Sequence, residues 1–146
     1  MQLSNQVKLQ RVSDAVAAGT TAINGSVVDT QGFDGVVFVV AMGAITAGAV
    51  TSVKVQQGAA SDLSDAADIA GTSVAIADTA DNKLVYVEVS HPRERYVRCV
   101  VSRATQNAAV DGIVAMLTGP RVVPTTHDAS TVAGGEAHVS AAEGTA

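Results

Sequence analysis

Short apolar runs separated by turn-forming residues dominate the chain, a pattern typical of antiparallel β-structure. Residues 36–42 are apolar at every position, which predicts a strand that is covered on both faces or meets a partner chain on one of them. Residues 50–56 alternate between apolar and polar side chains, which predicts a strand with one buried face. Five more segments combine such runs with flanking turn residues and are also expected to be strands: residues 27–30, 72–77, 83–90, 95–103 and 112–118.

Residues 83–90 and 95–103 have the clearest alternation of these segments. If the two segments form a hairpin, the parity of their faces sets the register and places Glu88 opposite Arg98. About seven strands at this spacing, in a chain of 146 residues, predict an all-β protein with one β-sandwich or jelly-roll domain.

The two ends of the chain differ from its strand-rich middle. Residues 1–26 follow no clean period and are expected to form an N-terminal arm or a weak strand, whereas residues 27–124 are expected to form the sandwich. Residues 125–146 contain almost no large apolar side chain, so this segment alone cannot offset the entropy of ordering it. We expect an extended C-terminal tail that neighbouring molecules hold in place. The alternative is that the tail folds back on its own domain.

The loops richest in acidic residues are residues 57–71 and 78–82. The first could hold one helical turn capped by Ser61. Calcium prefers clustered oxygen ligands, but neither loop has the spacing of an EF-hand. We therefore predict no metal site and no cofactor.

Composition and charge exclude several classes of function. The hydrophobic residues, 47% of the chain, are mostly alanine and valine, and only 3% of the residues are aromatic. A net charge of −5 argues against general attraction to nucleic acid. No apolar run is long enough to be a transmembrane helix, and the first residues lack the apolar core of a signal peptide. We expect a protein that binds neither nucleic acid nor membranes.

The sequence contains no recognisable catalytic constellation. His91 lies in a predicted turn, His127 and His138 lie in the tail, and no serine stands in a nucleophile elbow. Cys99 falls on the predicted inner face of a strand, where a buried and inert thiol is expected. We therefore predict that the protein is not an enzyme.

Arginines are concentrated within residues 93–103, with one tyrosine among them. Because arginine pairs well with carboxylates at protein interfaces, this segment predicts contact with an acidic partner surface. A solvated surface and single-stranded nucleic-acid binding are the alternatives. With one further arginine and the two phenylalanines, the candidate interface residues are Phe33, Phe38, Arg93, Arg95, Tyr96, Arg98, Arg103 and Arg121.

Three stretches, residues 32–57, 96–121 and 134–146, resemble a family of small virion proteins of tailed bacteriophages and prophages. Their sequences are GFDGVVFVVAMGAITAGAVTSVKVQQ, YVRCVVSRATQNAAVDGIVAMLTGPR and GGEAHVSAAEGTA. The similarity covers most of the chain from Gly32 onward, is weak before it, and includes no catalytic motif. It implies a head decoration or cement protein with a sandwich or jelly-roll fold.

Such a protein would be made in the host cytoplasm and would bind the major capsid protein on the surface of the virion. The symmetry of a shell favours dimers or trimers of the chain. Two other functions stay open. The first is a tail, neck or connector component, which copy number per particle would distinguish. The second is a carbohydrate- or receptor-binding sandwich, although sugar sites generally need exposed aromatic faces and the chain has only four aromatic residues.

Overall fold

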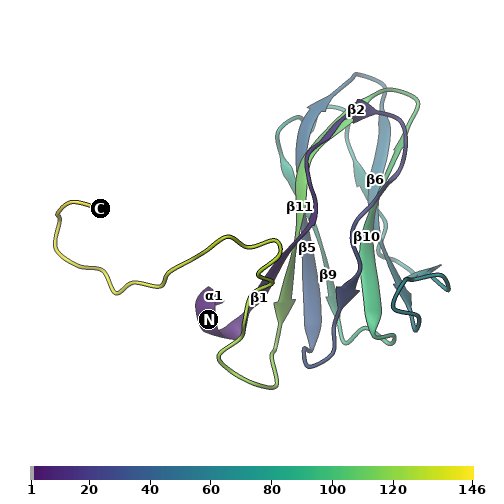
Figure 1. The fold of residues 1–146 in the computed structure, drawn as a ribbon. Helices are drawn as coiled ribbons and strands as arrows, with labels where there is room; N and C mark the ends of the chain where they lie inside the picture. Colours follow the sequence, from purple (N-terminus) through teal and green to yellow (C-terminus); the bar gives the residue numbers. More distant parts are fainter. Residues whose placement is uncertain (1) are drawn as a thin grey trace.

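The computed structural model describes residues 2–146, and it consists of two antiparallel sheets packed face to face (Figure 1). Sheet A contains, in spatial order, β1 (Lys8–Ser13), β11 (Ala108–Thr118), β5 (Gly35–Ile45) and β9 (Leu84–Ser90), and β2 (Val16–Gly19) also pairs with β11. Sheet B contains β3 (Ile23–Asn24), β10 (Tyr96–Ala104), β6 (Val50–Gly58) and β7 (Ala67–Asp68), with β4 (Val28–Asp29) beside β10 and β8 (Val74–Ile76) beside β6. Within residues 2–146 the only helix is the single turn α1 (Leu3–Gln6). The prediction of an all-β sandwich is confirmed.

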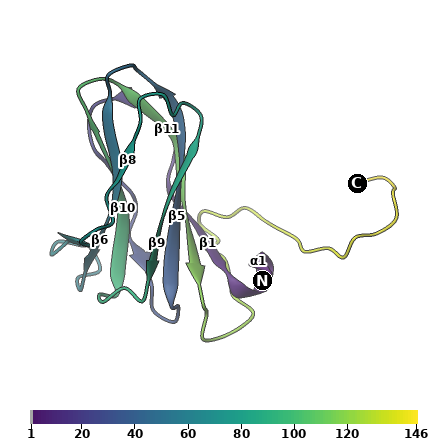
Figure 2. The same ribbon diagram turned by 180° about the vertical axis from the view of Figure 1, so that it is seen from behind.

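The strands pair in a nested order along the chain. β1 and β2 lie beside β11, β3 and β4 beside β10, β5 beside β9, and β6 beside β7 and β8. Figure 2 shows β5 and β9 running side by side, although β6 of sheet B lies between them in the sequence. This order results when a long antiparallel ribbon folds over itself and sends successive pairs to opposite sheets.

The core lies between the sheets, because alternate side chains of each strand point inward. Phe38, Met42, Ile113 and Leu117 are the largest fully buried side chains, and all four come from β5 and β11 of sheet A. Valines fill most of the remaining core, including those of β6 and β10. β-branched side chains pack well on such pleated surfaces, which explains why so few aromatic residues are needed.

The predicted hairpin between residues 83–90 and 95–103 is wrong. β9 pairs with β5 in sheet A, β10 pairs with β6 in sheet B, and residues 91–95 cross from one sheet to the other. Glu88 therefore lies opposite Val37, and Arg98 lies opposite Gln56. Alternation correctly indicates which face of each strand is buried, but it does not say which strand is the neighbour.

The described part of residues 1–26 belongs to the sandwich and is not an arm; Met1 lies outside the described residues. β1 pairs with β11 over most of its length, and the buried side chains of Val7 and Val12 belong to this segment. The period of the segment is irregular because a register shift between Arg11 and Ser13 interrupts the strand.

The helical turn predicted within residues 57–71 does not form, and β7 lies there instead. The carboxylate of Asp65, and not Ser61, organises the loop by accepting hydrogen bonds from the N–H groups of Ala59 and Ala60, at 2.8 and 3.2 Å. Leu63 anchors this loop with a buried side chain.

The C-terminal segment has two parts with different environments. Residues 125–132 lie along the outer edge of β1, where the Asp128 N–H donates to the Leu9 carbonyl at 3.2 Å. At two further points a side chain, and not a backbone carbonyl, accepts the hydrogen bond from β1. The Leu9 N–H donates to His127 Nδ1, and the Arg11 N–H donates to Thr131 Oγ1. Residues 133–146 form no strand. The first part therefore folds back on its own domain, as the alternative held. Of the second part, Gly134 to His138 line a hollow with Leu3, Leu9 and His127, and the residues after them extend away (Figure 1).

Candidate functional site

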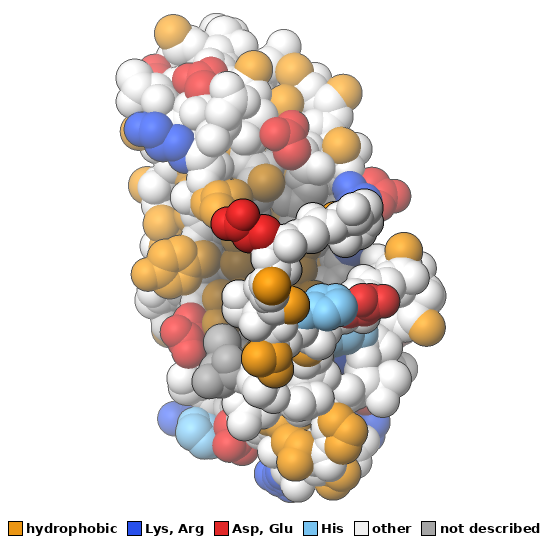
Figure 3. All heavy atoms as spheres, turned by 90° about the vertical axis from the view of Figure 1, so that its left-hand side faces the viewer, with side chains coloured by type: hydrophobic (Ala, Val, Ile, Leu, Met, Phe, Trp, Pro, Cys, Tyr) orange, Lys and Arg blue, Asp and Glu red, His pale blue; other side chains and the backbone are white. Residues whose placement is uncertain are grey.

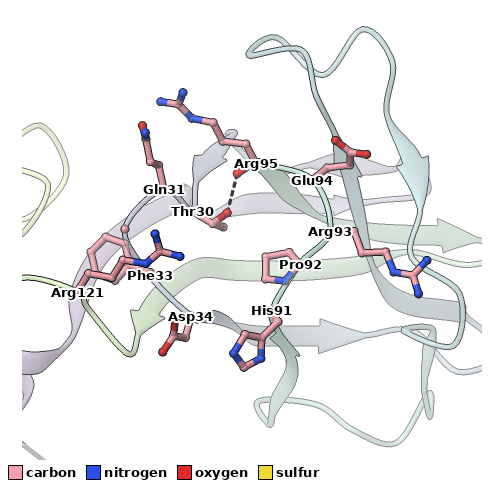
Figure 4. Close-up of a pocket in the computed structure, with 11 residues that line it drawn as sticks. Thr30, Gln31, Phe33, Asp34, His91, Pro92, Arg93, Glu94, Arg95 and Arg121 are labelled. Carbon is pink, nitrogen blue, oxygen red and sulfur yellow. Dashed lines mark hydrogen bonds between the residues drawn. The ribbon is translucent and has the colours of Figure 1, made fainter.

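One end of the sandwich brings together four of the eight candidate interface residues. Phe33, Arg93, Arg95 and Arg121 line a shallow depression of about 370 Å³ (Figure 4). Two hydrogen bonds connect its walls. Thr30 Oγ1 donates to the Arg95 carbonyl at 2.7 Å, and the Arg121 N–H donates to the Gly32 carbonyl at 2.9 Å. We call this region the end cluster.

Arg95 is held in a bidentate ion pair. Its Nε and Nη2 donate to Oδ1 and Oδ2 of Asp29, at 2.9 and 2.8 Å, and its guanidinium lies 5.1 Å from the centre of the Tyr96 ring. The hydrogen bonds from Arg95 hold the pKa of Asp29 below its ordinary value, and the carboxylate in turn raises the pKa of Arg95. This pair places Arg95 and Tyr96 at the border of the end cluster.

Arg93 and Arg121 have no such partner: the salt bridges within residues 2–146 involve neither side chain. Figure 4 shows the side chains of Arg93, Arg95 and Arg121 arising at different points and pointing in different directions. They do not converge on one position, so the geometry suits several separate carboxylates on a partner surface better than one small anion.

Phe38 and Arg103 are not on the surface, which corrects their place among the candidate interface residues. Phe38 is fully buried, and Arg103 is 8% exposed. Arg103 has the parity of Val97, Cys99 and Val101, a signal in the sequence that would have excluded it. Phe38 lies in a run that is apolar at every position, where the sequence does not say which face is inward. Arg98 lies on the outer face of sheet B, where its Nε donates to Gln56 Oε1 at 2.8 Å.

The guanidinium of Arg103 serves the fold. Nε donates to the Thr21 carbonyl at 2.6 Å, and Nη1 donates to the carbonyls of Ala17 and Ala108 at 2.9 and 2.6 Å. Burial lowers the pKa of Arg103 from its ordinary value, but an arginine stays charged under all folding conditions. The three carbonyls stabilise that charge, and Arg103 links β2, the following loop and β11.

The acidic turns and the single cysteine have local structural roles. Within residues 2–146, no group of three or more histidine, cysteine or acidic side chains is placed to hold a metal ion. The turn carboxylates of Asp78 and Asp81 accept hydrogen bonds from Gly48 N–H and Ile45 N–H, at 2.6 and 2.8 Å. Burial raises the pKa of the Cys99 thiol to about 12, so it is protonated and a poor nucleophile.

In the described part of the chain, no helix has the length and apolarity needed to cross a membrane.

The outer face of sheet A is a surface that the sequence reasoning missed. The strand register sets Tyr86, Val39 and Val114 side by side in one row across β9, β5 and β11. Leu84 is 69% exposed and Tyr86 is 68% exposed, the two largest values among the large hydrophobic side chains of this face. The row of Tyr86 ends at Arg11 of β1, and the next row, with Leu9, Met116 and Val37, ends at Glu88 of β9, so charged side chains border the apolar ones. We call the following set the apolar face: Leu9, Val37, Val39, Ala41, Leu84, Tyr86, Val114 and Met116.

The outer face of sheet B is more polar. Ser52, Lys54 and Gln56 of β6 lie on it beside Arg98 of β10, and none of these four side chains is apolar. Lys54 Nζ forms a 2.8 Å ion pair with Asp68, and this contact holds the pKa of Asp68 below its ordinary value. The same register also places Val50, Tyr96 and Val100 on this face. The outer face of sheet B is therefore mixed, whereas that of sheet A has the more continuous apolar rows and is closer in composition to an interface core.

Figure 3 shows the molecule from the side of sheet A. Hydrophobic side chains gather beside the protruding C-terminal segment, and charged side chains lie mostly toward the margins. The apolar run at residues 36–42 indicated this surface in the sequence. It predicted a strand that is covered on both faces by its own chain or that meets a partner chain on one face. The structure leaves Val37 and Val39 of that strand only half-buried.

Comparison of the chain with models of known protein families and with curated proteins finds no match to either.

Proposed function

We propose that this protein is a non-catalytic structural protein of a bacteriophage virion, a decoration or cement protein that binds the major capsid protein. The observation that carries the proposal is the contrast between the apolar face of sheet A and the more polar outer face of sheet B. An antiparallel sheet normally presents polar side chains to water. A protein bound to a shell would turn its apolar face to the shell and its more polar face to the solvent.

The dimensions of the apolar face support a contact of ordinary size only if its border takes part. Four strands spaced about 4.8 Å apart, over about seven residues of 3.3 Å, span roughly 450 Å². That area is within the range of about 300–600 Å² for the largest apolar patch on a monomer, patches that are often functional. A stable interface covers about 800 Å² on each partner. The end cluster supplies such a border, because it lies next to Gly35, where β5 begins, and next to Ser90, where β9 ends.

The fold supports the same proposal. In a jelly roll, two Greek keys form when a ribbon of paired strands folds over itself. Here the first strand pairs with the last, and each successive inner pair lies in the opposite sheet. This is the order expected of that arrangement. A rigid sandwich of this kind is the fold that the resemblance to phage virion proteins implies.

The test uses heads of the phage that encodes the chain, purified without the protein and then mixed with it. Leu84→Lys and Tyr86→Lys place charges on the apolar face at exposed positions, so the domain should fold while binding to heads weakens by at least about tenfold, or 1.4 kcal/mol. Ser52→Lys and Gln56→Lys are the matched controls on the outer face of sheet B and should bind as the unchanged protein does.

Heads that lack the protein should lose resistance to heat or osmotic shock, and the added protein should restore it. Equal robustness of heads with and without the protein would contradict the proposal. So would a copy number of about a dozen or fewer per particle, as expected for a neck or connector component at one vertex. Specific binding to a glycan array without binding to heads would contradict it in favour of a carbohydrate-binding sandwich.

A further inference from the structure

The two sheets have four lateral edges, and three of them are protected. The edges of sheet B consist of β3 and β4 on one side and β7 and β8 on the other, and each of these strands has only two or three residues. In sheet A, residues 125–132 cover β1 through backbone and side-chain hydrogen bonds. Short or covered edges are the usual means by which sheets avoid pairing with other chains.

The fourth edge, β9, is open. This strand has seven residues and pairs only with β5. The His91 N–H donates to the Asp34 carbonyl and the Met42 N–H to the Lys83 carbonyl, at the two ends of the pairing. Hydrogen-bonded pairs alternate in an antiparallel ladder. The backbone groups of Leu84 and Tyr86, and of Glu88 and Ser90 after them, therefore point away from β5 toward the free edge.

The sandwich is also incompletely closed beside this edge. A hollow there is lined by residues of both sheets, among them Gln57 and Ile69 of the β6–β7 region and Val89 of β9. Val74 of β8 opposes the fully buried Val53 and shares its inward parity, yet it is 39% exposed. An additional strand beside β9 would cover apolar side chains on this side.

The projecting segment has the pattern of a strand without a sheet. Ala137, Val139 and Ala141 alternate with the polar Glu136, His138 and Ser140, which is the period of a strand with one buried face. Val139 is 93% exposed. Within the described chain no backbone hydrogen bond engages residues 133–146.

One antiparallel register fits this segment to β9 in both pattern and charge. With Val139 opposite Val87, the small apolar row of the segment continues the inward row of β9. The same register sets His138 opposite Glu88 and Glu143 opposite Lys83. Opposite charges in directly facing positions stabilise a strand pair, whereas like charges destabilise it. A shift by one residue would send Val139 to the solvent face and lose the ion pair between Glu143 and Lys83.

The segment cannot reach the β9 edge of its own chain. Residues 125–132 lie beyond β1, and from there to a new strand beyond β9 is five strand spacings, or about 24 Å. Residues 132–136 span at most about 14 Å when fully extended. If this segment pairs with the β9 edge, it therefore does so on another copy of the chain.

We infer that residues 136–143 of each molecule add as an antiparallel strand to β9 of a neighbouring copy and so link the copies. Each molecule donates one segment and accepts one, so the contact joins two different surfaces. It gives a ring or a reciprocal pair where the rotation between copies closes, and an open filament where it does not. The backbone hydrogen bonds supply affinity, and the alternate side chains set the register. This contact concerns copies of the chain alone and does not depend on a phage shell as the partner.

The first experiment measures self-association of the purified full-length chain by sedimentation over a range of concentrations. Ser140→Pro removes an N–H that the register directs at β9, in a segment outside the sandwich. It should weaken association at least about tenfold, a change of 1.4 kcal/mol, while thermal unfolding stays unchanged. Ala146→Pro is the matched control outside the paired residues and should associate as the unchanged chain does. A chain that is monomeric at every concentration would overturn the inference.

A charge exchange tests the register. Lys83→Glu and Glu143→Lys should each weaken association. A mixture of the two single variants should associate no more strongly than the unchanged chain does. The double variant in one chain should restore association, since each copy then presents the reversed pair. Weakening by both single variants without recovery in the double variant would overturn the register.

Disulfide formation between copies gives a second, independent readout. Chains with Tyr86→Cys are mixed with mass-tagged chains carrying Ser140→Cys and oxidised with a mild thiol oxidant. The register brings these Cα atoms within the range of about 4.4–6.8 Å that a disulfide requires. Ala141→Cys in place of Ser140→Cys is the control, since it faces the other side of the sheet. Equal cross-linking by both mixtures, or a disulfide within a single chain carrying Tyr86→Cys and Ser140→Cys, would contradict exchange between copies.

Discussion

Arg103 is a charged side chain inside the sandwich, and the carbonyls around it explain why the fold tolerates it. It donates to the carbonyls of Ala17, Thr21 and Ala108, all at hydrogen-bonding distance. Buried carbonyls that lose a donor are costly. A sequence shows only that an arginine stands at an inward position, whereas two of the carbonyls that meet it, those of Ala17 and Thr21, come from a segment more than 80 residues away.

Arg103→Leu should lower the free energy of unfolding by about 2–4 kcal/mol, because three carbonyls lose a charged donor. Arg98→Leu is the same substitution on the same strand, on the outer face of sheet B, and should cost less than about 1 kcal/mol. Urea denaturation of both variants measures the difference. Equal losses of stability would show that Arg103 has no special structural role.

Asp29 gives the stability of the protein a dependence on pH in the acid range. The hydrogen bonds from Arg95 lower the pKa of this carboxyl in the folded chain, so the unfolded chain binds a proton more readily. The stabilising contribution is present above the ordinary carboxyl pKa of about 4 and is lost as the pH falls through the lowered folded value. The effect is small, because both partners are about half exposed.

Asp29→Asn should therefore be less stable than the unchanged protein at neutral pH, and the difference should shrink as the pH falls below about 4. Denaturant titrations at a series of pH values measure this difference directly. A difference that is constant down to the most acidic pH would show that the ion pair does not stabilise the fold.

At the scale of the elements, the coverage of β1 decides which part of the tail belongs to the domain. Residues 125–132 satisfy backbone groups of β1 that would otherwise face water, and Thr125 Oγ1 also donates to the Val7 carbonyl at 2.9 Å. Residues 133–146 make no such bonds to the sandwich within the described chain. The sequence pattern treats residues 125–146 as one polar tail, because edge coverage by polar side chains leaves no apolar signature.

A chain that ends at residue 132 should be as stable as the full chain, within about 0.5 kcal/mol. A chain that ends at residue 124 should lose about 1–3 kcal/mol, because several hydrogen bonds along β1 disappear. Thermal and urea unfolding of the two truncations measure the step between them. Equal stability of the two truncations would mean that residues 125–132 do not support β1.

At the scale of the whole molecule, the nested pairing joins the two ends of the sandwich-forming sequence. β11 lies between β1 and β5, so the last strand requires the first. Such long-range pairing makes the fold one cooperative unit, in which no early segment is dispensable. Residues 1–26 were expected to form an arm or a weak strand, and the structure has β1, β2 and β3 there, so the segment belongs to the same unit as residues 27–124.

Deletion of residues 2–13 should therefore abolish cooperative unfolding, because β1 and the buried side chain of Val12 are lost. Cys99 provides the measurement, since its thiol is buried and its pKa is raised to about 12 in the folded chain. A thiol reagent should label the full chain only as fast as it unfolds and should label the deletion variant at once. The chain that ends at residue 132 is the control and should stay protected. Protection of Cys99 in the deletion variant would show that the segment is a dispensable arm.

The sequence by itself determined which segments are strands and which of their faces point inward. Local alternation shows the inward face of β10, where Val97, Cys99 and Val101 are buried, and Arg103 has the same parity although it was assigned to the surface. Only the tertiary structure decided the neighbours. The separation of β9 from β10, the place of β1, the apolar face and the open edge all depend on packing between residues far apart in the chain, and no local pattern encodes that packing.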